Sequence, residues 1–179
     1  MSIQLKKLYP ILFVILVVAI ALSLLIISET TTRAALEARE DQETLMLIQE
    51  IFPETSFYTF NKDTEIYTLY NNGRREIGYA LYGEDWGYRS KIAVLVGLED
   101  KETIRGIVVT SQYEDWPYWN RLEESDFFDQ FTGLNIEDCY PSYSWLPGGV
   151  DAATGATISS FGVVNAVRKA ALEKIKYLD

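Results

Sequence analysis

A run of 21 residues without a charged side chain, Leu8–Ser28, constrains this chain more than any other feature. As an α-helix the run would be about 31 Å long, which matches the hydrocarbon core of a bilayer. A cleaved signal peptide is the alternative. Its apolar region is shorter, about 7–15 residues, and it ends in a small-x-small site that the residues after Ser28 do not provide. We therefore expect an uncleaved transmembrane helix at residues 8–28.

The charges on either side of the run predict its orientation. Lys6 and Lys7 precede it, and positive residues mark the cytoplasmic flank of a membrane span. Basic and acidic residues are interleaved after the run. We expect a single-pass protein of the cell membrane with residues 1–7 in the cytoplasm, a helical stalk at residues 29–52 and one extracytoplasmic domain at residues 53–179.

Charge and composition exclude several kinds of function. The chain has 16 basic and 26 acidic residues, and setting aside Lys6 and Lys7 raises the acidic excess to about 12. Nucleic-acid binding needs a basic surface and is not expected. With Cys139 as the one cysteine and no histidine, the chain cannot form an iron–sulfur cluster, a His-ligated metal site or a Ser-His-Asp unit. Any redox chemistry here would need an organic cofactor, and no metal is expected.

The middle of the chain predicts strands, and its ends predict helices. Runs of aromatic and β-branched residues place strands at residues 57–60, 65–70, 76–82, 91–98 and 103–110. We expect loops at residues 83–88 and 111–120, a short helix at residues 125–131 capped by Ser125, and a final helix at residues 159–178. This order predicts an α+β fold: the transmembrane helix, then a domain with a mainly antiparallel sheet and a C-terminal helix. No Gly-x-Gly-x-x-Gly follows a strand, so a Rossmann nucleotide site is unsupported.

The stretch VDAATGATISS, residues 150–160, gathers hydroxyl side chains around Gly155 where the last helix is expected to begin. Backbone N–H groups in the first turn of a helix lack partners, and the helix dipole is positive there, so the position favours a phosphate. Gly155 would let a bulky group approach the backbone closely. Ordinary N-capping by Thr157 or Ser159 is the alternative explanation.

The order of residues Asp151-Ala152-Ala153-Thr154-Gly155-Ala156-Thr157 resembles the pattern Asp-x-x-Ser/Thr-Gly-Ala-Thr of the FMN-binding domains of the RnfG and NqrC proteins. The resemblance implies that FMN is joined covalently to Thr157 by a phosphoester bond. It also implies that Asp151 and Thr154 serve recognition by a flavin transferase or contacts to the phosphate. Gly155, Ala156 and Ser159 would then complete the cofactor site.

The same resemblance implies a role and partners. The chain would be an electron-carrying flavoprotein subunit of an Rnf-type ion-translocating electron transport complex, rather than a stand-alone enzyme. Its partners would be the other membrane subunits and a separate flavin transferase that uses FAD as donor. An NqrC protein, or a solitary membrane flavoprotein of the family, is a second possibility. A non-redox anchored binding or sensor domain is the possibility from another class.

One segment departs from the family pattern. Family members usually carry a Glu-Thr-Pro-Gly-Leu-Gly-like segment against the flavin, whereas this chain has Glu114-Asp115-Trp116-Pro117-Tyr118-Trp119. Glu114 is kept and aromatic residues such as Trp116 replace the glycines. These rings could stack on the flavin, belong to the core or form a docking surface. Trp145 and Leu146 are the other candidate flavin walls.

Overall fold

The computed structural model of the chain describes residues 2–142 and 149–178, with only the backbone described at residues 2–12, 27, 30–35, 37 and 38 of the first helix. That helix, α1 (Ser2–Ile51), runs through both the expected membrane span and the expected stalk. The chain divides into two compact units, Met1–Glu43 and Thr44–Asp179. Within the residues that the structure describes, no helix is both long enough and apolar enough to cross a membrane.

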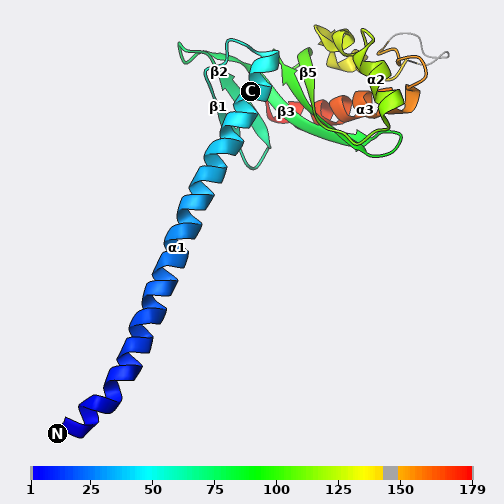
Figure 1. The fold of residues 1–179 in the computed structure, drawn as a ribbon. Coiled ribbons are helices and arrows are strands. Elements are labelled where there is room, and N and C mark those ends of the chain that lie inside the picture. The colour runs from blue at the N-terminus through cyan, green and yellow to red at the C-terminus, as the bar shows by residue number, and fades with distance from the viewer. Residues whose placement is uncertain (1, 143–148, 179) are drawn as a thin grey trace. The chain divides into compact units, whose positions relative to one another are not determined.

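The described part of the second unit is built on a six-stranded sheet in which each strand pairs antiparallel with the next one along the chain (Figure 1). Short hairpin connections join the first five strands, whereas a longer connection, residues 112–133, leads to the sixth. The strands are β1 (Phe57–Asn61), β2 (Ile66–Tyr70), β3 (Glu76–Trp86), β4 (Lys91–Leu98), β5 (Thr103–Ser111) and β6 (Leu134–Asn135). The predicted α+β fold with an antiparallel sheet is confirmed.

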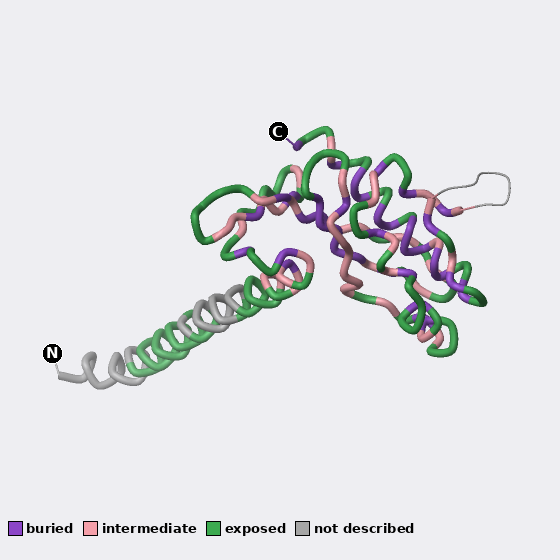
Figure 2. The backbone as a smooth tube through the Cα atoms, turned by 90° about the horizontal axis from the view of Figure 1, so that it is seen from above, coloured by how far each residue is buried: buried purple, intermediate pink, exposed green. Residues whose placement is uncertain are grey.

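One face of the sheet packs against α3 (Thr157–Lys174). Figure 2 shows buried positions recurring through the second unit, whereas the described part of the long N-terminal helix is mostly exposed. Val94 and Val96 of β4 belong to the same buried cluster as Val163 and Val167 of α3. Residues two apart in a strand share a face, so the alternation of β4 directs these valines toward the helix. The C-terminal helix is therefore fixed to the centre of the sheet along most of its length.

The opposite face of the sheet is covered by the last turns of α1. Leu95, which lies between the two valines of β4, is buried with Ala80, Ile48 and Phe52. The sheet is therefore apolar on both faces at its centre. This explains why β4 reads as a continuous apolar run rather than an alternating one.

Glycines allow α3 and β3 to approach closely. A Cβ atom added at Gly83 would lie 2.3 Å from the carbonyl oxygen of Ala166. One added at Gly162 would lie 2.7 Å from the carbonyl oxygen of Trp86 and 2.9 Å from the Cα of Gly87. The backbones of α3 and β3 are therefore in direct contact. This contact sets the distance between the start of α3 and the β3–β4 turn.

Two segments that were expected to be loops are in part regular secondary structure. Residues 83–86 continue β3, because they pair in register with residues 91–94 of β4 and this pairing overrides their weak strand preference. The expected loop at residues 111–120 is interrupted by α2 (Trp116–Glu123), which has a proline in its first turn and buries Trp119 and Leu122. Those two positions are too few to give a helical pattern in the sequence.

The ends of the remaining helices also differ from the expectation. The helix expected at residues 125–131 is a 3-10 turn, η1 (Phe128–Phe131), whose N-cap is Phe127. Ser125 is not its cap, because its hydroxyl donates a 3.0 Å hydrogen bond back to the carbonyl oxygen of Leu122. A second 3-10 turn, η2 (Ile136–Asp138), follows β6. The final helix begins two residues earlier than expected and is followed by the 3-10 turn η3 (Ile175–Tyr177).

Candidate functional site

The first turn of α3 has no side-chain cap. Its N-cap residue is Ala156, which has no hydroxyl. The Ser160 hydroxyl donates to the Ala156 carbonyl oxygen at 3.0 Å and accepts the Ala153 N–H at 3.1 Å, while the Ser159 hydroxyl donates to Glu114. Ordinary capping by Thr157 or Ser159 is therefore wrong. The positive end of the helix is left for a partner other than its own side chains.

A cavity of about 270 Å³ opens at this helix start. The Thr157 side chain is exposed and lines the cavity. Gly155, with a φ of +80°, makes the turn that leads into the helix, a conformation that favours glycine. The lining consists of Tyr88, Tyr118, Gly155, Ala156, Thr157, Ile158 and Ser159. Four of the residues predicted for the cofactor site, at positions 155, 156, 157 and 159, are thus brought together.

Two tyrosines also line the cavity, one from the aromatic segment whose rings were candidates for stacking on the flavin and one, Tyr88, that was not expected there. Tyr88 lies in the β3–β4 turn and Tyr118 in α2, and their ring centroids are 5.3 Å apart with a tilt of 55°. Tyr118 stands in the aromatic segment that departs from the family pattern, which was the available signal. The two rings are the aromatic part of the cavity lining, the tyrosine wall.

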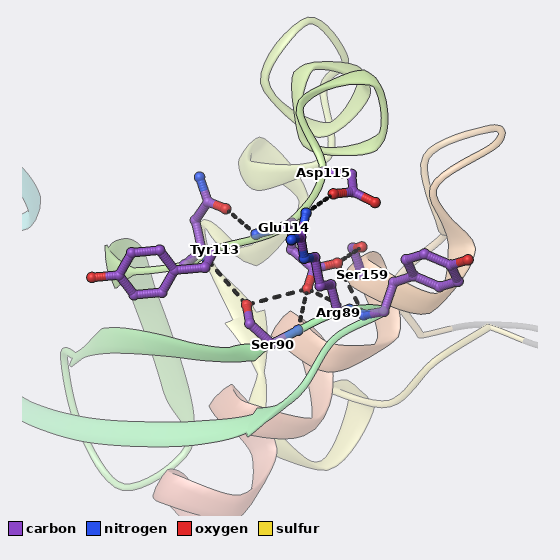
Figure 3. Close-up of polar contacts among 8 residues, drawn as sticks. Arg89, Ser90, Tyr113, Glu114, Asp115 and Ser159 are labelled. Atoms are coloured by element: carbon purple, nitrogen blue, oxygen red, sulfur yellow. Dashed lines mark hydrogen bonds and ion pairs between the residues drawn. The ribbon is translucent and has the colours of Figure 1, made fainter.

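Glu114 ties three segments of the site together (Figure 3). Its carboxylate accepts hydrogen bonds from the backbone N–H groups of Tyr88, Arg89 and Ser90, each at 2.9 Å, and from the hydroxyl of Ser159. The carboxylate does not line the cavity. It joins the turn that carries Tyr88 to the helix that carries Thr157, so it holds the two walls of the cavity in place.

These contacts determine the protonation state of Glu114. Burial alone would raise the pKa of its carboxyl, because the charged form loses water. The hydrogen bonds from the Ser159 hydroxyl and from the backbone of residues 88–90 together outweigh burial and hold the pKa of Glu114 below its ordinary value. Glu114 is therefore a carboxylate at neutral pH, and its lone pairs are occupied by five donors, the fifth being the Ser90 hydroxyl at 3.4 Å.

The other predicted site residues lie in different surroundings. Asp151 is exposed, and its backbone forms a pair of hydrogen bonds with the Gln130 amide, at 2.8 and 3.0 Å. The carbonyl oxygen of Thr154 accepts a 3.3 Å hydrogen bond from Arg121. Trp116 is 74% exposed and does not line the cavity. Trp145 and Leu146 lie outside the described residues.

This arrangement can hold an anion, but it is not built to activate a nucleophile. The chain has no histidine, and Glu114 is a weak base because its pKa is lowered and its oxygens are occupied. The described residues contain no group of three potential metal ligands. An uncapped helix start, a glycine turn and an exposed threonine suit a phosphate ester, and the tyrosine wall suits a flat aromatic group. The residues present therefore fit a flavin mononucleotide attached at Thr157.

Comparison with protein families gives a match at the same place. Residues 87–172 match the model of the FMN-binding domain. This range begins at the β3–β4 turn, ends within α3 and contains every residue that lines the cavity.

Individual relatives are similar over different shares of the chain. The chain is 28% identical over 167 residues to the G subunit of the ion-translocating oxidoreductase complex of Methanosarcina acetivorans, covering 87% of this chain and 88% of that protein. It is 35% identical over 91 residues to the protein of the same name from Escherichia coli O157:H7, covering 48% of this chain and only 44% of that relative. Among solved structures, the crystal structure of Shewanella oneidensis NqrC aligns with a TM-score of 0.48 and 19% identity over 70% of each chain.

Proposed function

We propose that this chain, which belongs to the family of FMN-binding domains that includes RnfG and NqrC, is an electron-carrying flavoprotein subunit of an Rnf-type ion-translocating electron transport complex. FMN is its cofactor, joined to Thr157 through a phosphoester bond. The observation that carries the proposal is the exposed Thr157, at an uncapped helix start beside a cavity within the FMN-binding domain.

The chain's own residues would hold the cofactor. Thr157 anchors the phosphate, and the N–H groups at the start of α3 stabilise its negative charge. Tyr88 and Tyr118 offer aromatic surface to the flavin ring and exclude water from that side. When bound, the flavin supplies the electron-carrying chemistry that the side chains of this protein lack.

Attachment would need a second protein. A bond forms between Thr157 Oγ and the phosphorus of the FMN phosphate, the pyrophosphate bond of FAD breaks, and AMP leaves. The hydroxyl proton must pass to a base, and the described residues around Thr157 offer none. A flavin transferase would supply that base, and Asp151 and Thr154, both exposed ahead of Thr157, are placed where such an enzyme could recognise them.

The proposal includes a membrane anchor and neighbouring subunits. The uncharged residues 8–28 are proposed as the transmembrane helix, with Lys6 and Lys7 on the cytoplasmic side and the FMN-binding domain on the other. The other membrane subunits of the complex would donate and accept its electrons.

Mass spectrometry tests the attachment. The full-length chain, co-expressed with a flavin transferase, should gain the mass of FMN on the peptide that contains Thr157 and should fluoresce in a denaturing gel. Thr157→Ala removes the oxygen that forms the ester and should abolish both signals. Thr132→Ala, which removes an exposed hydroxyl outside the motif, is the matched control and should keep them. Covalent flavin on the Thr157→Ala variant would refute the assignment.

The same experiment separates the alternatives. A wild-type chain that stays without flavin after co-expression would favour a non-redox binding domain, in which the exposed Tyr113 and Trp116 serve as a protein interface. A loaded chain excludes that alternative. The subunits that co-purify with the loaded chain would then distinguish an Rnf-type complex from an Nqr-type complex and from a solitary flavoprotein.

A further inference from the structure

Arg121 lies at the flavin site, although no feature of the motif points to it. It stands in the last turn of α2, and its guanidinium reaches across to the turn that precedes α3. There Nη1 donates to the carbonyl oxygen of Thr154 at 3.3 Å. A Cβ atom added at Gly155 would lie 1.7 Å from the same nitrogen. The guanidinium therefore rests directly on the backbone of Gly155, two residues before Thr157.

The charge of Arg121 is not neutralised by a carboxylate in the part of the chain that the structure describes. Nearby cations behave differently: Arg89 forms an ion pair with Asp115, and Lys91 forms one with Glu84. The guanidinium has five N–H donors, and the hydrogen bond to Thr154 uses one of them. Arg121 does not itself line the cavity, but its guanidinium rests on Gly155, which does. In a chain with a net charge of −10, an anionic ligand held beside Gly155 would give this guanidinium a partner.

The location of Arg121 matches the location of the expected anion. Gly155, on which the guanidinium rests, lines the same cavity as Thr157. Helix α3 offers its uncapped N–H groups to the same space. A planar guanidinium is well suited to phosphate oxygens, since it can donate two parallel hydrogen bonds.

We propose that Arg121 binds the phosphate of the flavin nucleotide carried by Thr157, and that it holds the cofactor against the turn at Gly155. This inference rests on the proposed function, because it requires a flavin phosphate at Thr157. It adds a side-chain cation from α2 to a site otherwise made from the α3 turn and the tyrosine wall. It also gives Gly155 a second reason to be glycine, since any side chain there would displace the guanidinium.

The test uses full-length chains in detergent, and each chain is prepared in two forms. The loaded form carries covalent flavin after co-expression with the transferase, and the unloaded form is expressed without the transferase. The variants are Arg121→Gln, Arg121→Lys and Arg75→Gln. Arg75 is an exposed arginine in the β2–β3 turn, at the end of β3 remote from the site, so its substitution removes the same charge elsewhere. Two quantities are measured: the phosphorus-31 resonance of the phosphodiester, and the rise in Tm on loading.

In Arg121→Gln we expect the phosphorus resonance to shift and the rise in Tm to shrink by about 3 °C or more, because a charge-assisted contact to the phosphate is lost. Arg121→Lys keeps the positive charge but loses the planar guanidinium, so its rise in Tm on loading should lie between those of Arg121→Gln and the wild type. This variant also tests the proposal if Arg121→Gln fails to fold. Arg75→Gln should match the wild type. A wild-type resonance and Tm rise in both Arg121 variants would overturn the role of Arg121 while leaving the proposed function intact. A wild type without flavin would instead refute the proposed function.

Discussion

At the scale of single residues, Glu114 holds the framework of the site together, because its carboxylate joins the β3–β4 turn to Ser159. Its position against the flavin, which the family resemblance implies, stays a prediction. Glu114→Gln should destabilise the domain by about 2 kcal/mol, because a neutral amide accepts weaker hydrogen bonds and brings an NH2 group toward N–H donors. Thermal unfolding at pH 7 measures this. Glu102→Gln, which removes an exposed carboxylate from the β4–β5 turn, should leave the Tm nearly unchanged.

The effect of Glu114 should depend on pH in a defined direction. Its folded-state pKa is lowered, so its contribution to stability is fully present above the ordinary glutamate pKa of about 4.3 and is lost as the pH falls through the folded-state value. The Tm difference between wild type and Glu114→Gln should thus be constant from pH 7 to about 5 and narrow below about 4. A difference that stays constant down to pH 3 would show that the charge of Glu114 does not stabilise the fold.

The sequence motif predicts half of the cavity, and the fold supplies the rest. Thr157, Gly155 and Ser159 are close in sequence, so a local pattern is enough to group them. Tyr88 and Arg121 come from a hairpin turn and a separate helix, and only the packing of α2 and β3 against α3 brings them to the site. Single-sequence reasoning has no signal for such distant neighbours unless the residue type is unusual, as with the aromatic replacements around Tyr118.

At the scale of elements, the contact between α3 and β3 determines where Thr157 stands. Alanine in place of glycine within a helix ordinarily stabilises it by about 1 kcal/mol. Gly162→Ala should do the opposite, because its Cβ would press on the backbone of Trp86 and Gly87 and push the start of α3 away from the sheet. We expect a lower Tm and less covalent flavin after co-expression, measured by calorimetry and mass spectrometry.

The control for this contact is Gly106→Ala in β5. An added Cβ there would meet its nearest atom, the Cγ2 of Ile51, at 3.4 Å, an ordinary contact distance. This variant should load with flavin as the wild type does. If Gly162→Ala were as stable and as fully loaded as Gly106→Ala, the close approach of helix and strand would not be what positions the site.

Helices and strands can be predicted from the sequence where residues of one class, such as apolar residues, follow one another. Residues 91–98 are almost all apolar and are found as the strand that was expected. The prediction fails for α2, whose eight residues mix aromatic, polar and proline side chains and become a helix because Trp119 and Leu122 find buried positions. It also fails at the end of β3, where Glu84 and Asp85 are held in the strand by pairing with Ala93 and Ile92 of β4.

At the scale of the whole molecule, the chain combines an acidic domain with an uncharged N-terminal run. The domain has no catalytic group of its own around Thr157 in the described residues, so both loading and electron transfer would depend on other proteins. An anchor would keep such a carrier beside its partners in two dimensions and raise their effective concentration. The proposed function therefore requires that residues 8–28 hold the chain in the membrane.

Two charges placed in the middle of this run test the anchor. Leu16 and Ile20 lie one turn apart in α1 and both are exposed. In the double variant Leu16→Lys, Ile20→Lys, each lysine at the bilayer centre should cost about 3 kcal/mol of insertion free energy. We expect the wild type to stay in membranes washed with alkaline carbonate, and the double variant to be lost from them. Immunoblotting of the washed pellet and supernatant measures the distribution.

The matched control places the same two charges in the stalk. Gln42→Lys with Met46→Lys adds two charges at exposed positions four residues apart in the same helix, outside the uncharged run, so the variant should remain in the pellet like the wild type. Protease added to right-side-out vesicles should cut the domain of both membrane-bound proteins, because Lys6 and Lys7 retain the N-terminus inside. A double-lysine variant at positions 16 and 20 that resists the carbonate wash would show that another feature attaches the chain to the membrane. Protection of the domain in those vesicles would show that the orientation is reversed.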